Sequence, residues 1–285
     1  MPDYILKPKI ELEENSLSSI SSEEYLPAFE GDEVHLPVAT EVSPLPAESR
    51  VVVHSDPRSA GADRFKLVRI RLQNLQATRG LKRLLITSPL PADGKSTVAL
   101  NLATVLSDKG KHAVLLLEAD VYRPSLLKKL GIKPWGGLTD SYKRGTDPMM
   151  AIRRIDPLGF YLLPAGRPTE DGGSLLQSNF FSELVKGLSS NFFRWILIDS
   201  PPTTPIADIL VLKGIADGTL LIARAGRTPR EAIEETTRNL GRDHIVGIIL
   251  NDVEGLEHTY SQYYGYVKPE TQAKPEANKG LLHLG

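Results

Sequence analysis

The chain has 285 residues, of which 41% are hydrophobic and 24% are charged, and its formal net charge is −1. This composition supplies enough apolar residues for the core of an ordinary soluble protein. The chain contains no cysteine, which excludes disulfides, thiol catalysis and cysteine-bound metal. No apolar run is long enough to cross a bilayer, and the N-terminus lacks the layout of a signal peptide. We therefore expect a cytoplasmic protein.

The first 50 residues differ in charge from the rest of the chain. They carry eleven acidic and three basic side chains, which leaves the remaining residues with a net charge of +7. Segments such as SLSSISSEEY and VSPLPAESR are typical of disorder. We expect a disordered acidic leader over 1–50, a P-loop domain over 51–255 and a flexible tyrosine-bearing tail over 256–285. The leader is also suited to docking on a basic face of its own domain or of a partner.

After residue 51, short apolar runs alternate with stretches of helical periodicity. Residues 64–76 are predicted to form a helix, and its apolar face comprises Phe65, Val68, Leu72 and Leu75. Further helices are predicted at 97–110, 178–191 and 230–241, and strands at 81–88, 112–120, 159–166, 194–202, 218–226 and 245–252. The alternation predicts an α/β fold with a mostly parallel central sheet and helices on both faces.

The turn between the first predicted strand and its helix is SPLPADGKST. A Walker A loop wraps backbone N–H groups around phosphate oxygens, while its lysine reaches the outer phosphates and its hydroxyl binds magnesium. Gly94, Lys95 and Ser96 supply the second half of this motif, whereas Pro89 stands where the strict pattern has its first glycine. The residues predicted to bind the phosphates of ATP are Pro91, Ala92, Asp93, Gly94, Lys95, Ser96 and Thr97.

Two later strands end in carboxylates, in the segments LLLEADVYRP and ILIDSPP. Ligands bind at the carboxyl ends of parallel strands, so Glu118, Asp120 and Asp199 are expected to meet near Lys95. Because magnesium prefers oxygen ligands and keeps several waters, we predict that Ser96, Asp120 and Asp199 hold it. Asp199 follows four apolar residues and has the pattern of a Walker B acid.

Together these motifs resemble those of the bacterial tyrosine kinases (BY-kinases) that control capsule and exopolysaccharide export. The resemblance extends from about Val51 to Tyr266. The family P-loop has the form S-x-x-P-G-x-G-K-S-T, from which only Ala92 departs. Its Walker A′ motif, D-x-D-x-R-R-P, stands here as EADVYRP, with Glu118 replacing the first aspartate and Tyr122 replacing an arginine. The Walker B motif matches closely.

The resemblance implies roles for residues outside the P-loop. The family motif E-x-x-R-x-x-R joins subunits into a ring, and its positions are occupied here by Asp63, Lys66 and Arg69. The family also autophosphorylates a C-terminal tyrosine cluster, which here comprises Tyr260, Tyr263, Tyr264 and Tyr266.

Further residues are candidates for catalysis or for contact with the nucleotide. The resemblance makes Glu118 and Asp120 the candidates to accept the phenolic proton, so the predicted catalytic residues are Lys95, Glu118, Asp120 and Asp199. Arg123 is a candidate phosphate contact, and Asn251, at the end of the last predicted strand, is a candidate adenine contact. Asp208 matches an aspartate of the family, although an acid at a helix N-terminus explains it equally well.

The implied function is that of an ATP- and Mg²⁺-dependent protein-tyrosine kinase that regulates capsule or exopolysaccharide synthesis and export. In this family a cytoplasmic segment of a membrane chain-length protein activates the kinase. Because the chain has no membrane segment of its own, we expect a separate partner to recruit it to the inner face of the membrane. Its implied substrates are protein tyrosines, including those of a neighbouring subunit in a homo-oligomer.

Other functions are compatible with the same motifs. Partition and division-site ATPases share the sheet and the Walker motifs, although SPLPADG lacks their signature second lysine. A catalytically weak regulatory subunit would bind nucleotide and signal through its assembly state alone, and the glutamate at position 118 favours it. Nucleic-acid binding is not expected, because the basic surplus is modest and lacks interleaved aromatic residues.

Overall fold

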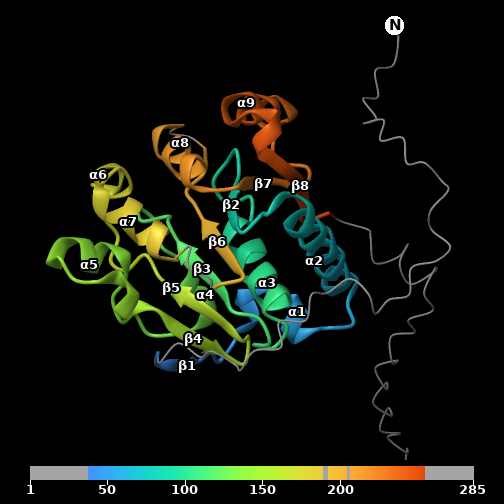
Figure 1. Cartoon of the computed structure of the whole chain (residues 1–285). Coiled ribbons are helices and arrows are strands. Elements are labelled where there is room, and N and C mark those ends of the chain that lie inside the picture. The colour runs from blue at the N-terminus through green and yellow to red at the C-terminus, as the bar shows by residue number, and fades with distance from the viewer. Residues whose placement is uncertain (1–37, 189–191, 204–205, 254–285) are drawn as a thin grey trace, which may run out of the picture. The chain divides into compact units, whose positions relative to one another are not determined.

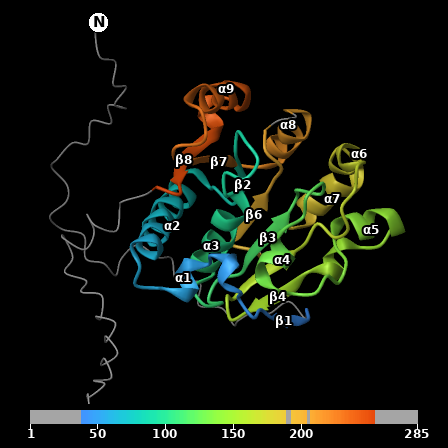
Figure 2. The ribbon, with the colours of Figure 1, turned by 180° about the vertical axis from the view of Figure 1, so that it is seen from behind.

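The structure is a computed structural model that describes residues 38–188, 192–203 and 206–253. Over these residues the chain forms an eight-stranded sheet with helices on both faces (Figure 1; Figure 2). The strand order is β1-β4-β5-β3-β6-β2-β7-β8. Only the β4–β5 pair is antiparallel among the neighbours in this sheet of described residues. The mostly parallel α/β fold predicted from the sequence is confirmed.

The strands and helices have the following bounds. The strands are β1 (Thr40–Val42), β2 (Arg83–Thr87), β3 (Val114–Glu118), β4 (Arg153–Asp156), β5 (Phe160–Leu163), β6 (Trp195–Asp199), β7 (Gly218–Arg224) and β8 (Ile245–Asn251). The helices are α1 (Val52–Ser55), α2 (Ala60–Arg79), α3 (Lys95–Ser107), α4 (Leu126–Leu130), α5 (Leu138–Arg144), α6 (Gly172–Leu176), α7 (Asn179–Leu188), α8 (Ile206–Ile215) and α9 (Arg230–Leu240). Every predicted strand and helix is present, whereas β1 and β4 were not predicted.

Regular structure begins earlier than the predicted boundary at residue 50. The register of β1 with β4 pairs Thr40 with Arg154, and a 3-10 helix follows at Ala47–Ser49. Ser43 is buried, and its Oγ donates a hydrogen bond to the carbonyl oxygen of Leu130. This contact ties the segment to the folded domain, which the composition of the leader does not indicate. The remainder of the predicted leader, residues 1–37, and the predicted tail from residue 254 onward lie outside the described residues.

The strands β2, β3 and β6 form the centre of the sheet and are covered on both faces. Alternate residues of a strand point to opposite faces, yet Leu115, Leu116 and Leu117 of β3 are all fully buried. Leu116 belongs to the apolar cluster that contains the buried face of α3. Because these strands are parallel, their carboxyl ends lie at the same edge, where the predicted site residues follow them.

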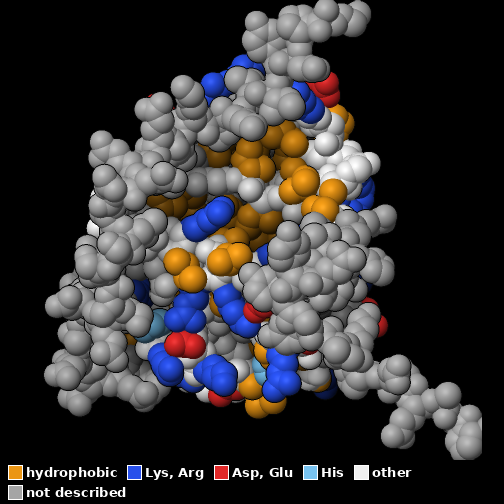
Figure 3. Space-filling model, turned by 90° about the vertical axis from the view of Figure 1, so that its right-hand side faces the viewer, with side chains coloured by type: hydrophobic (Ala, Val, Ile, Leu, Met, Phe, Trp, Pro, Cys, Tyr) orange, Lys and Arg blue, Asp and Glu red, His pale blue; other side chains and the backbone are white. Residues whose placement is uncertain are grey.

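Helix α2 has one face toward the core and one toward solvent. Its predicted apolar face packs against the core through Phe65, Val68, Leu72 and Leu75. Large hydrophobic side chains are exposed on α2 and on the edge strand β8, namely Leu67, Ile70, Ile248 and Leu250. Figure 3 faces this side and shows hydrophobic side chains gathered beside a group of Lys and Arg side chains. Among the described helices, none combines the length and apolar character needed to span a membrane.

Candidate functional site

A cavity of about 670 Å³ lies at the carboxyl ends of the central strands. The predicted site residues that line it are Pro91, Ala92, Gly94, Lys95, Ser96, Thr97, Asp120, Arg123 and Asn251. Three other predicted residues, Asp93, Glu118 and Asp199, are almost completely buried and do not line the cavity. The fold therefore brings residues from distant parts of the sequence to one place, but their side chains have different environments.

Asp93 belongs to the P-loop, and its side chain stabilises the loop through two hydrogen bonds. Its Oδ2 accepts a hydrogen bond from the backbone N of Leu90 (3.1 Å), and its Oδ1 accepts one from Thr228 Oγ1 (2.8 Å). Asn251 Nδ2 donates to the carbonyl oxygen of Asp93 (2.9 Å). The side chain of Asp93 thus supports the loop, and its contribution to phosphate binding would come from its backbone. The adenine contact predicted for Asn251 stays a prediction.

Two residues of the P-loop have left-handed backbones, Ala92 with φ 65° and Gly94 with φ 101°. A Cβ atom at Gly94 would lie 2.1 Å from Nδ2 of Asn251, so only glycine fits there. The family pattern has glycine at position 92, where the alanine of this chain costs about 1–2 kcal/mol. The surrounding contacts therefore hold the loop in a conformation that its own residues do not all favour.

Asp199 ends β6 beneath the P-loop and is fully buried. Neither of its carboxylate oxygens has a hydrogen-bond partner among the described residues. Burial raises the pKa of Asp199 to about 7, although the charge of Lys95 lowers it. A buried carboxylate without a partner beside a serine hydroxyl is a donor set that fits Mg²⁺. Within the described ranges no three His, Asp or Glu side chains form a metal-binding group, so phosphate oxygens and water would complete the coordination.

Glu118 ends β3, and both of its carboxylate oxygens are used by backbone N–H groups. Oε1 accepts hydrogen bonds from Ser125 N (2.6 Å) and Leu126 N (2.8 Å), and Oε2 accepts one from Ala165 N (3.1 Å). Burial raises the pKa of Glu118, while these three N–H groups lower it. The side chain joins β3 to the start of α4 and to the turn after β5. Glu118 does not reach the cavity, so its predicted catalytic role lacks geometric support.

The replacement Glu118→Ala is expected to lower the free energy of unfolding by about 3–5 kcal/mol, because three buried N–H groups lose their acceptor. Urea denaturation measures this change. Glu183, which is exposed on α7, offers a control, and its replacement by alanine is expected to change stability by less than about 0.5 kcal/mol. Equal stabilities of the Glu118→Ala and Glu183→Ala proteins would contradict the structural role.

Asp120 is the carboxylate of the Walker A′ segment that does face the cavity. Its Oδ1 accepts a hydrogen bond from the backbone N of Arg123 (3.1 Å). Burial raises the pKa of Asp120, and the N–H of Arg123 together with the charges of Lys95 and Arg123 lowers it. Asp120 is therefore close to the P-loop lysine and open to a ligand.

Tyr122 links the Walker A′ segment to helices α6 and α8. Its hydroxyl donates a 2.6 Å hydrogen bond to Oδ2 of Asp208, a buried residue in the first turn of α8. Partial burial and this carboxylate raise the pKa of Tyr122 to about 12. A Cβ atom at Gly172 would lie 2.6 Å from Cζ of Tyr122, so the ring occupies space that glycine leaves open at the start of α6. The sequence marked Tyr122 only as a departure from the family motif.

Three cations at the cavity were not predicted from the sequence, namely Arg50, Lys129 and Arg224. Lys129 lies on the short helix α4, and its Nζ donates a 3.1 Å hydrogen bond to Thr97 Oγ1 of the P-loop. None of these three cations belongs to a nucleotide-binding motif, and the fold brings them to the cavity.

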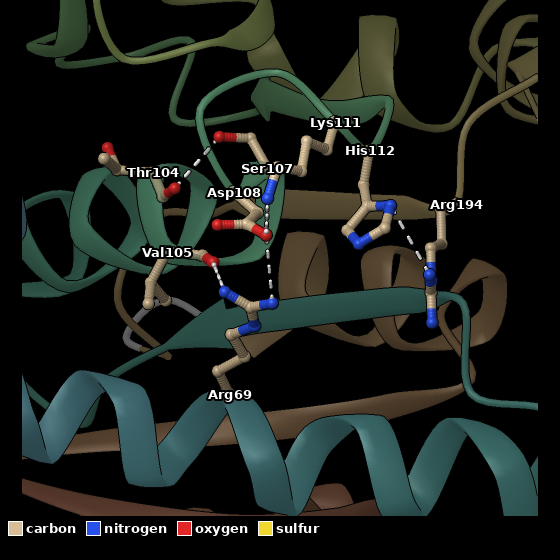
Figure 4. A network of polar contacts seen from close by, with 8 residues as sticks. All are labelled: Arg69, Thr104, Val105, Ser107, Asp108, Lys111, His112 and Arg194. Atoms are coloured by element: carbon tan, nitrogen blue, oxygen red, sulfur yellow. Dashed lines mark hydrogen bonds and ion pairs between the residues drawn. The ribbon is translucent and has the colours of Figure 1, made fainter. Parts of the chain in front are cut away.

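The three residues predicted to join subunits lie on α2. Lys66 Nζ forms an ion pair with Asp63 Oδ1 (2.7 Å) in the same helix. Arg69 instead donates a hydrogen bond to the carbonyl oxygen of Val105 (3.1 Å) and lies 3.5 Å from Asp108 Oδ2 at the end of α3 (Figure 4). A cation at a helix C-terminus is favourable, so Arg69 stabilises the contact between α2 and α3 within one chain. The predicted ring contact stays a prediction, and the four predicted acceptor tyrosines lie outside the described residues.

Comparison with known proteins identifies the family. No family model matches the chain. Tyrosine-protein kinase CpsD of Streptococcus agalactiae is 30% identical over 198 residues, which cover 68% of this chain and 85% of that protein. The chain belongs to the bacterial tyrosine-protein kinase family. The resemblance inferred from the Walker motifs is therefore confirmed.

This BY-kinase also matches part of a longer protein and nearly the whole of a solved kinase domain. The succinoglycan biosynthesis transport protein ExoP of Rhizobium meliloti is 27% identical over 249 residues, which cover 81% of this chain and 31% of that protein. The solved kinase domain of VpsO is 27% identical with a TM-score of 0.58, covering 68% of this chain and 98% of that domain. The sheet order and the P-loop agree with a P-loop NTPase fold of the BY-kinase type.

Proposed function

We propose that this BY-kinase transfers the γ-phosphoryl group of ATP to protein tyrosines, including its own C-terminal cluster on a neighbouring subunit. The observation that supports this function is the convergence of Lys95, Ser96, Asp120 and Asp199 at one end of the sheet. Phosphoryl transfer asks mainly for positioning and for neutralisation of negative charge, and this set of groups is suited to both.

The P-loop would bind the phosphates through its backbone N–H groups and through Lys95. The Ser96 hydroxyl and the carboxylate of Asp199 would bind Mg²⁺ directly, and the carboxylate of Asp120 would act on it through water. When bound, Mg²⁺ neutralises charge on the phosphates and orients them. The unpartnered oxygens of Asp199 support this assignment, because an ionised carboxylate in the interior is costly unless it is paired or bound to metal.

The transfer step needs a group that accepts a proton. A phenol with a pKa near 10 is protonated at neutral pH. As its oxygen forms a bond to the γ-phosphorus, the bond from that phosphorus to the bridging oxygen of ADP breaks, and the phenolic proton must leave. We assign this proton to Asp120, because it faces the cavity whereas both oxygens of Glu118 are engaged by backbone N–H groups.

Self-association through α2 would bring the tail of one subunit to the cavity of the next. Leu67 and Ile70 of this helix are exposed, and Lys66 and Asp63 lie on its surface. Arg69 would contribute indirectly, because its guanidinium fixes α2 against α3. A ring-like homo-oligomer is the assembly that we infer for this interface.

The proposed biological role is the regulation of capsule or exopolysaccharide synthesis and export. The name of ExoP, a relative that acts in succinoglycan biosynthesis, supports this role. We infer that the cytoplasmic segment of a separate membrane protein activates the kinase and recruits it to the inner face of the membrane.

Incubation of the purified protein with Mg²⁺ and ATP tests the function directly. Mass spectrometry is expected to find phosphate on Tyr260, Tyr263, Tyr264 or Tyr266, and addition of the partner segment is expected to increase it. Release of ADP without modified tyrosine would indicate a plain ATPase. Nucleotide binding without either product would indicate a regulatory subunit, and both outcomes would contradict the kinase function.

A further inference from the structure

Lys129 is a cation of the nucleotide cavity that contacts the P-loop from another element. It lies near the end of α4, while Lys95 begins α3. Its Nζ reaches Thr97 Oγ1 at 3.1 Å, and its side chain lines the cavity. The amine is also close enough to Asp199 for the two charges to interact. Lys129 therefore faces the same space as Lys95 and Ser96.

The surroundings of Lys129 balance its charge only in part. Across the described residues, Lys129 forms no ion pair, and the Thr97 hydroxyl is a neutral acceptor. Burial lowers the pKa of Lys129, whereas the charge of Asp199 raises it and that of Arg50 lowers it. Holding an ammonium in a half-buried position beside another cation is unfavourable without an anion nearby.

Positive charges outnumber negative ones in the lining of the whole cavity. Its cations are Arg50, Lys95, Arg123, Lys129 and Arg224, and its acids are Asp120 and Asp252. Arg224 is already paired with Asp252 at 2.5 Å. Since Asp199 is assigned to the metal, an anionic ligand would balance the remaining positive charge. A chain of phosphates supplies it.

We propose that Lys129 is a second phosphate-binding lysine of this kinase, which contacts the phosphate chain of the nucleotide from α4. On nucleotide binding its Nζ exchanges part of its contact with the Thr97 hydroxyl for a charged phosphate oxygen. The stronger, charge-assisted hydrogen bond offsets the cost of keeping the ammonium half-buried. The role of Lys129 rests on the proposed nucleotide-dependent function, and it deepens that function by adding a contact that no P-loop motif contains.

The test compares four full-length proteins: wild type, Lys129→Met, Lys129→Arg and Lys128→Met. Lys128 is the matched control, because it precedes Lys129 on α4 but is exposed and does not line the cavity. Calorimetric titration with ADP in the presence of Mg²⁺ measures affinity, and steady-state assays give KM for ATP and kcat. Thermal unfolding without nucleotide reports whether each variant folds.

Lys129→Met is expected to weaken Mg·ADP binding about tenfold or more and to raise KM for ATP. Lys129→Arg, which keeps the charge, is expected to recover most of the affinity, and Lys128→Met to bind like wild type. Equal affinity of Lys129→Met and wild type would overturn the proposal and leave the kinase function standing. An equal loss of affinity in Lys128→Met would also overturn the proposal. It would likewise be overturned if Lys129→Met were unfolded and the folded Lys129→Arg protein did not recover the affinity. A wild-type protein that binds no Mg·ADP would overturn both.

Discussion

Replacing Lys95 with methionine is expected to abolish tyrosine phosphorylation, with a rate at least about 100-fold below that of wild type. Lys95 is almost completely buried at the start of α3, and its charge acts on both Asp120 and Asp199. The methionine side chain has a similar length but no charge, so the phosphates lose the cation that neutralises them as transfer proceeds. We expect Lys95→Met to lower kcat while the protein remains folded.

Phosphosite mapping after incubation with Mg·ATP measures the loss of tyrosine phosphorylation. The Lys95→Met sample also shows which phosphates do not come from the kinase itself. Lys128→Met is the control for the loss of one positive charge and is expected to remain active, because its side chain is exposed. A Lys95→Met protein that keeps more than about a tenth of the wild-type phosphorylation would show that the P-loop lysine is not the essential cation.

Replacing Asp199 with asparagine is expected to separate activity from stability. The rate of phosphorylation should fall about 100-fold or more, because Mg²⁺ loses a negatively charged ligand. The metal-free protein should nevertheless become more stable, since the two oxygens of Asp199 are buried without hydrogen-bond partners among the described residues. Removing the charge of a buried carboxylate that lacks hydrogen-bond partners is expected to raise Tm by about 2–8 °C.

Thermal unfolding in chelator and again with Mg·ADP checks the Asp199→Asn prediction. Wild type is expected to gain more stability from Mg·ADP than the variant does. Asp243 is an exposed acid, and the change Asp243→Asn is expected to leave both measurements unchanged. A lower Tm for metal-free Asp199→Asn would mean that the ionised carboxylate stabilises the fold.

The sequence predicts the parts of the fold that depend on continuous apolar runs. The buried strands β2, β3 and β6 are such runs, although Arg83 at the start of β2 is partly exposed, and their parallel order places Asp120 and Asp199 at the edge where α3 begins. The strands β1 and β4 escape prediction because they are short, and β4 begins with Arg153 and Arg154. Only Ile155 of these two strands is fully buried, so pairing with neighbouring strands contributes much of what holds them in the sheet.

The direction of a side chain is harder to predict than its place along the strand. Glu118 ends β3 where a catalytic acid is expected, but its oxygens accept hydrogen bonds from the N–H groups of Leu126, which begins α4, and Ala165, which follows β5. The hydrogen bond from Tyr122 to Asp208 and the contact of Lys129 with Thr97 join segments far apart in the chain. No local pattern encodes such contacts, so they become visible only once the sheet is assembled.

We infer that one cavity holds Mg·nucleotide between the P-loop, Asp120 and Asp199. A crystal structure of the protein with Mg²⁺ and ADP tests it most directly. We expect the diphosphate on the N–H groups of residues 94–97 with Lys95 in contact, and the metal beside Ser96 and Asp199. A structure with ordered Mg·ADP away from both Lys95 and Asp199 would contradict the claim.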